Sequence, residues 1–165
     1  MSGENSSTLS GEVRYLAHEK ARPGQLEMIH DCLGALSSGG YHLAAAPTGI
    51  GKTAAALSAA IEVARSAAVP KKILFLTSRQ SQHKIVVDTV RKLNQRLKEN
   101  LRPVTVVDII GRESMCEVVD IQTGRCLCEQ GSSEGSRARS KEDLRGFLLR
   151  EPRHVYETVQ HAKIS

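Results

Sequence analysis

The hydrophobic residues of this chain follow two patterns, a helical spacing and short continuous runs. Leu26, Ile29, Leu33 and Leu36 recur at helical spacing, which predicts an amphipathic helix over residues 24–36. Helical patterns also cover residues 52–65, 79–98, 141–150 and 152–163. Short continuous apolar runs instead predict buried strands over residues 41–45, 73–77 and 104–110.

The order of these elements predicts the fold. Buried-type strands that alternate with helices indicate an α/β protein with a parallel, doubly wound sheet and helices on both faces. We expect residues 1–11 to be a disordered tail and residues 12–110 to form the sheet domain. Periodicity is lost over residues 111–140, and residues 111–165 are expected to begin an irregular, cysteine-containing insert.

A phosphate-binding motif lies between the first predicted strand and the helix over residues 52–65. Residues 46–53 read Ala-Pro-Thr-Gly-Ile-Gly-Lys-Thr and fit G-x-x-x-x-G-K-S/T, with Ala46 at the first position. The glycines let the backbone bend around a phosphate, and Lys52 should reach the β- and γ-phosphates of ATP while the Thr53 hydroxyl holds Mg²⁺. The motif therefore predicts a RecA-like P-loop NTPase. The residues predicted to contact the nucleotide are Pro47, Thr48, Gly49, Ile50, Gly51, Lys52 and Thr53, of which Lys52 and Thr53 are the catalytic candidates.

Composition narrows the class of protein. A chain of 165 residues can bury one modest core, and the excess of 23 Lys and Arg over 18 Asp and Glu gives a net charge of +5, which is compatible with a nucleic-acid partner. No apolar run approaches the roughly 18 residues of a membrane span, and no signal peptide is visible. We therefore expect a cytoplasmic protein, nuclear if eukaryotic, whose four cysteines are thiols or metal ligands rather than disulfides. Cys32 lies beside the apolar stripe of its helix and is expected to be a small core residue.

Two polar groups accompany the phosphate-binding motif. Arg22 and Gln25 form an R-x-x-Q upstream of it, and a glutamine amide offers the donor and acceptor that match adenine N6 and N7, although Gln25 could equally be a plain surface residue. Thr77, Ser78 and Arg79 follow the second predicted strand, at the sheet edge where ligands bind. These three residues are candidate phosphate-backbone contacts; the alternative is a polar loop in which Ser78 caps the next helix.

A third group introduces cysteines. Residues 111–116 read Gly-Arg-Glu-Ser-Met-Cys, and Cys126 and Cys128 lie beyond them. Over about residues 22–128, the order of R-x-x-Q, P-loop, hydroxyl–arginine group and G-R-x-x-x-C resembles the XPD/DinG-like iron–sulfur superfamily 2 DNA helicases. That resemblance implies an ATP-dependent DNA helicase, moving 5′ to 3′, with a 4Fe–4S domain inserted in its first motor domain.

The resemblance also assigns roles to residues. Arg22 and Gln25 would read adenine, and Thr77, Ser78 and Arg79 would contact single-stranded DNA. The cluster ligands would be Cys116, Cys126 and Cys128.

Three features of the sequence depart from the family pattern. One residue separates Cys126 from Cys128, no fourth cysteine follows, and Asp108 lacks the acidic neighbour of a Walker B motif. We therefore expect an amino-terminal part of a helicase, with the second motor domain as its partner and little activity alone. The other hypothesis is a stand-alone P-loop module whose cysteines, with His154 or His161, bind zinc or no metal.

Overall fold

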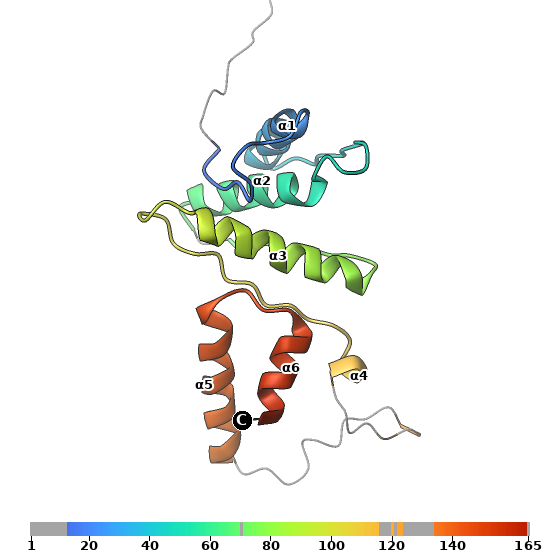
Figure 1. Ribbon diagram of the computed structural model, residues 1–165, viewed down its shortest axis with the longest axis vertical. Helices are drawn as coiled ribbons and strands as arrows, with labels where there is room; N and C mark the ends of the chain where they lie inside the picture. The colour runs from blue at the N-terminus through green and yellow to red at the C-terminus, as the bar shows by residue number, and fades with distance from the viewer. Residues whose placement is uncertain (1–12, 70, 116–119, 121, 124–133, 165) are drawn as a thin grey trace, which may run out of the picture. The chain divides into compact units, whose positions relative to one another are not determined.

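The computed structural model describes residues 13–69, 71–115, 120, 122–123 and 134–164 of the chain. Every regular element in these ranges is helical, and none of their residues lies in a strand (Figure 1). The helices are α1 (Gln25–Ser37), α2 (Lys52–Ser66), α3 (Gln80–Arg96), α4 (Arg112–Met115), α5 (Glu134–Arg150) and α6 (Val155–Ile164).

The predicted α/β fold with a parallel sheet is wrong for the part of the chain that the structure describes. The three predicted strands are present as non-helical segments that pair with no other described segment. Their apolar side chains are largely exposed: Leu43 is 99% exposed, Leu74 82% and Ile109 65%. A strand is defined by the ladder of hydrogen bonds to a neighbour, so an apolar run of the right length does not form one without a partner segment.

The helices follow the hydrophobic periodicity more closely. The predictions over residues 24–36, 52–65 and 79–98 are confirmed as α1, α2 and α3, and those over residues 141–150 and 152–163 correspond to α5 and α6. α5 begins earlier than predicted, at Glu134, and the single turn of α4 was not predicted. None of the helices in the described ranges is both long enough and apolar enough to cross a membrane.

The chain folds as two compact units, which are considered separately below. Of the described residues, those within 1–75 and 95–101 form the first unit, and those within 76–94 and 102–165 form the second. The predicted disordered tail, residues 1–11, lies outside the described residues.

The core of the first unit lies between α1 and α2, which pack against each other (Figure 1). Ile29 and Cys32 of α1 meet Ala55 and Ala59 of α2, and small alanine side chains allow the two helices to approach closely. Partly buried apolar side chains surround this centre: Val13, Leu16, Met28, Leu33 and Leu36. The prediction that Cys32 is a core residue is confirmed, and burial raises the pKa of its thiol.

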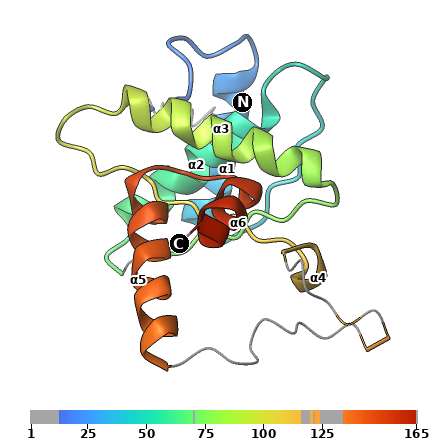
Figure 2. The same ribbon diagram turned by 60° about the horizontal axis from the view of Figure 1, so that its bottom comes forward.

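In the second unit, α5 and α6 lie beside each other (Figure 2). The ring of Phe147 in α5 stacks on the ring of His161 in α6, with their centroids 3.9 Å apart. The guanidinium of Arg153 lies over the Phe147 ring at 4.4 Å, and Asp143 is 2.7 Å from the His161 ring nitrogen. Aromatic stacking and charged contacts therefore connect these two helices.

Candidate phosphate-binding site

The loop that leads into α2 has the backbone conformation that the phosphate-binding motif requires. Gly49 and Gly51 have φ angles of 91° and 88°, in the left-handed region that side chains disfavour. Gly51 is the N-cap of α2, so no side chain caps this helix, and the first turn contains no acidic residue. The positive end of the α2 dipole is therefore not neutralised by a side chain of the helix itself.

Lys52, the first residue of α2, is folded back over the loop. Its ammonium donates hydrogen bonds to the carbonyl oxygens of Ala46 at 2.8 Å and Pro47 at 2.9 Å. The side chain is exposed, and no carboxylate among the described residues forms an ion pair with it. Among the described residues, the partners of this cation are therefore the two carbonyl oxygens.

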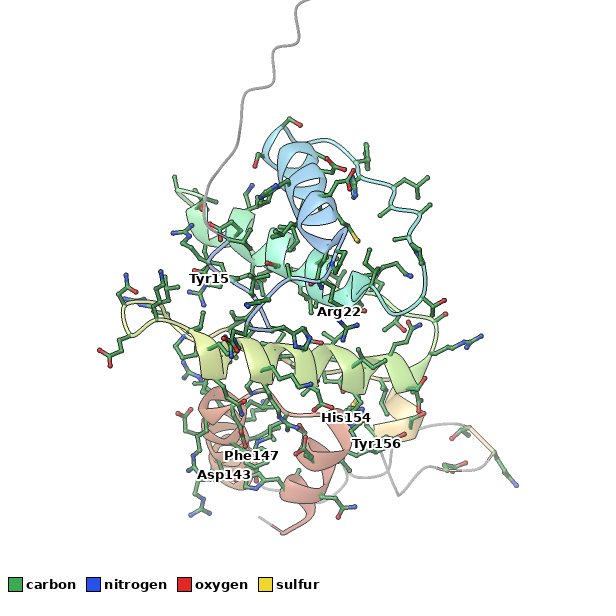
Figure 3. The ribbon with its side chains drawn as sticks, turned by 45° about the horizontal axis from the view of Figure 1, so that its top comes forward. Tyr15, Arg22, Asp143, Phe147, His154 and Tyr156 are labelled. Carbon is green, nitrogen blue, oxygen red and sulfur yellow. The ribbon has the colours of Figure 1, made fainter. Side chains whose placement is uncertain are left out.

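The side chains of Arg22 and Gln25 bind two carbonyl groups of the loop, and we call this pair of residues the brace. The Arg22 guanidinium donates to the carbonyl of Gly49, and Gln25 Nε2 donates to the carbonyl of Gly51 at 3.1 Å. Gln25 Oε1 in turn accepts a hydrogen bond from the Arg22 backbone N–H at 3.1 Å. Figure 3 labels Arg22 at the start of α1, facing the beginning of α2. Two side chains that are separated from the motif in sequence are therefore part of the loop's structure.

Glycine at position 51 also makes room for this brace. A Cβ atom there would lie 2.6 Å from Gln25 Nε2, well inside the contact distance of two heavy atoms. Gly24, with a φ angle of 75°, similarly faces the side chain of Ile50, which would lie 3.0 Å from an added Cβ. The turn before α1 and the loop before α2 thus fit together through glycine on each side.

The charged groups at the loop are positive. Arg22, Lys52 and the amino-terminal end of α2 bring positive charge together, and no described carboxylate pairs with either side chain. Such a site favours an anion, and Thr53 follows Lys52 in the first turn, where a hydroxyl can bind a metal ion carried by a phosphate. The residues present are therefore compatible with a magnesium-bound triphosphate.

Thr77, Ser78 and Arg79 belong to the second unit and lie just before α3. The Thr77 hydroxyl accepts a hydrogen bond from the Arg79 N–H at 3.1 Å and lies 2.6 Å from Gln82 Oε1. A local role at the start of α3 therefore belongs to Thr77 rather than to Ser78. Contact of these residues with DNA stays a prediction.

Asp108 has a structural environment that the sequence did not reveal. Its Oδ1 lies 2.6 Å from His83 Nδ1, and its Oδ2 accepts a hydrogen bond from the Val155 N–H at 2.8 Å. His154 Nε2 is 3.6 Å from the same Oδ2, and the Asp108 side chain is only 7% exposed. The carboxylate therefore fixes the amino-terminal end of α6 to α3. No short-range sequence pattern indicates a contact between residues this far apart in the chain.

A second anchor for α6 involves Glu157. Its Oε2 accepts hydrogen bonds from the His154 N–H at 2.7 Å and from the Arg91 guanidinium at 2.6 Å. Burial opposes ionisation of this carboxyl, but the hydrogen bonds from His154 and Arg91, with the charges of Arg91 and Arg153, leave its pKa below the usual value. A glutamate three residues after the residue preceding a helix is half of a capping box, so the bond to the His154 N–H could have been found from the sequence. The bond to Arg91, 66 residues away, could not.

The predicted iron–sulfur ligands Cys116, Cys126 and Cys128 lie outside the described residues. Within the described ranges, no group of three or more His, Cys, Asp or Glu side chains is arranged to hold a metal ion. His154 and His161, which the zinc hypothesis used, contact Asp108 and Asp143 respectively. The iron–sulfur cluster and the zinc site both stay predictions.

Comparisons of the chain with protein-family models, with curated proteins and with solved structures found no match.

Proposed function

We propose that the loop over residues 46–53 binds the phosphate groups of magnesium-bound ATP. The observation that carries this proposal is the Lys52 ammonium, which is held over a glycine loop by the carbonyls of Ala46 and Pro47 and pairs with no described carboxylate. A triphosphate would exchange these two neutral acceptors for charged phosphate oxygens, which form stronger hydrogen bonds with an ammonium group.

The neighbouring residues have complementary roles in this proposal. Gly49 and Gly51 allow the backbone N–H groups of the loop to surround a phosphate, and Pro47, Thr48 and Ile50 complete its wall. Lys52 contacts the β- and γ-phosphates, and the Thr53 hydroxyl binds Mg²⁺. The proposal depends on this local geometry and not on a parallel sheet.

The wider role that we propose is that of an ATP-dependent DNA helicase acting in the cytoplasm or nucleus. It is supported by the order of sequence motifs alone, with Thr77, Ser78 and Arg79 as contacts to single-stranded DNA.

The chain contains no acidic pair of the Walker B type, so we expect ATP turnover well below about 1 s⁻¹, the lower end for phosphoryl-transfer enzymes. DNA-stimulated turnover above that rate would contradict this expectation. A cluster at Cys116, Cys126 and Cys128 would give absorbance near 400 nm in anaerobically purified protein.

Titration calorimetry with Mg-ATP tests the phosphate site. The Lys52→Ala protein should bind at least about 100-fold more weakly than the wild type, because a charged hydrogen-bond donor to the triphosphate is lost. Lys92→Ala makes the same change at an exposed lysine of α3 and should bind as the wild type does. Equal affinities of the wild-type and Lys52→Ala proteins would contradict the proposed function.

A further inference from the structure

Gln25 was expected to read adenine, but its amide already has partners within the chain. Its Oε1 accepts from the Arg22 N–H and its Nε2 donates to the Gly51 carbonyl, each at 3.1 Å. The residue is only 2% exposed. An amide has bonding capacity beyond these two contacts, but a base can use that capacity only where it can reach the amide. Burial therefore keeps Gln25 away from a nucleobase.

Hydrogen bonds to the carbonyls of Gly49 and Gly51 hold the loop's peptide groups in place. Arg22 binds the Gly49 carbonyl, and the Gly51 carbonyl accepts both Gln25 Nε2 and the Ala55 N–H of α2, the latter at 3.0 Å. The chain has no cis peptide bond among the described residues, and in a trans peptide the N–H of the next residue points opposite to the carbonyl. The N–H groups of Ile50 and Lys52 are therefore turned away from the Arg22–Gln25 segment.

We propose that Arg22 and Gln25 are positioning residues that preorganise the loop for a polyphosphate, so that the site binds nucleoside triphosphates with little selection of the base. This inference rests on the proposed function and specifies its ligand class. Backbone donors that are fixed before binding lose little conformational freedom when a phosphate arrives, so the brace raises affinity for any ligand that carries the triphosphate group. Selection of adenine would instead require free polar groups, and Gln25 does not supply them.

The wild-type protein tests base selection without any substitution. Titrations with Mg-ATP, Mg-GTP and Mg-tripolyphosphate should give dissociation constants for ATP and GTP within about threefold of each other, with measurable tripolyphosphate binding. ATP affinity more than about 30-fold above GTP affinity would overturn the inference while leaving the phosphate site intact. Absence of binding by all three ligands would overturn the proposed function itself, and the inference with it.

Variants of the brace test its mechanism. Gln25→Ala removes the bond to Gly51 and should weaken binding of all three ligands by a common factor of about ten, the typical worth of one hydrogen bond. Arg22→Met, at an exposed side chain, should act in the same direction on all three. Asp31→Ala, at an exposed side chain in the middle of α1, serves as the control and should leave all three affinities unchanged.

Melting temperatures separate the brace from a purely structural role. A Gln25→Ala protein that melts earlier but binds the three ligands as the wild type does would contradict the proposal. So would a loss confined to ATP, because that pattern identifies Gln25 as a base-reading residue. If Gln25→Ala does not fold, the wild-type comparison and Arg22→Met still decide the question.

Discussion

Two helices of this protein begin in opposite electrostatic environments. At the start of α6, the Val155 N–H binds the Asp108 carboxylate and the Glu157 carboxylate binds the His154 N–H. At the start of α2, the N-cap is Gly51, the first turn has no acidic residue, and the cation of Lys52 lies over the loop. Both ends carry the partial positive charge of a helix amino terminus.

The difference indicates which end is available to a ligand. The carboxylates of Asp108 and Glu157 already bind the start of α6. Their role is to hold this helix in place. The start of α2 gathers two further cations and is left without a carboxylate partner among the described residues. An external anion bound at the start of α2 would supply the negative charge that Asp108 and Glu157 supply at the start of α6.

The largest expected effect comes from giving α2 an anion of its own. Thr48→Glu places a carboxylate in the exposed part of the loop, and its repulsion of a triphosphate should weaken Mg-ATP binding at least about 100-fold, or about 2.7 kcal/mol. Because the charge complements Lys52 and the helix dipole, the melting temperature should not fall. Thr48→Gln has nearly the same shape without the charge, and comparable weakening by it would show that charge is not the cause.

A methyl group at Gly51 tests the geometry of the same helix start. Gly51→Ala combines a strained φ with a clash against Gln25, so it should lower the free energy of unfolding by about 2–3 kcal/mol and weaken Mg-ATP binding about tenfold. Gly39→Ala is the control, because Gly39 has a similar φ of 74° but no atom within 4 Å of an added Cβ. Urea unfolding and calorimetry should find only the smaller strain cost in the control. Equal effects of the two variants would mean that the Gln25 contact is unimportant.

At α6 the corresponding change should affect stability and not binding. Asp108→Asn removes the buried charge that faces His83 and the Val155 N–H, and should cost about 1–2 kcal/mol in urea unfolding. Its Mg-ATP affinity should equal that of the wild type. Asp88→Asn, at a more exposed carboxylate that pairs with Arg91 at 3.3 Å, should cost less than about 0.5 kcal/mol. A loss of ATP binding in Asp108→Asn would remove the distinction between the two helix ends.

The smallest effect is a dependence of stability on pH at Glu157. Its pKa is lower in the folded protein than the ordinary value of 4.5, so it stabilises the fold above about pH 4.5, and this contribution is lost as the pH falls through the lower folded value. Because the side chain is 40% exposed, solvent screens the interaction and we expect less than about 1 kcal/mol. Glu157→Gln should flatten the stability profile in this acidic range. An unchanged profile would exclude Glu157 as the titrating group.

Local sequence patterns predicted local structure well. The apolar spacing in residues 24–36 identified α1, and the glycines at positions 49 and 51 have the positive φ angles that the motif required. A helix forms its backbone hydrogen bonds within a few residues, so its pattern is contained in the segment itself. The same holds for a loop whose bends depend on glycine.

Partners that are distant in sequence could not be predicted in this way. The apolar run over residues 73–77 suits a strand, but a strand needs a neighbour, and the structure provides none among the described residues. Gln25 was expected to face a base, and only packing revealed that its amide contacts Gly51. The pairing of Asp108 with His83 and Val155 was likewise invisible.

The sequence by itself determined helices α1, α2 and α3, the conformation of the glycine loop and the cationic character of residues 46–53. The tertiary structure decided that Asp108 binds the start of α6, and that Arg22 and Lys52 pair with no carboxylate among the described residues. It also turned Gln25 toward the loop before α2. The physical reason is range: helical hydrogen bonds and glycine torsions are set within a few residues, whereas charge pairing and burial depend on segments that only folding brings together.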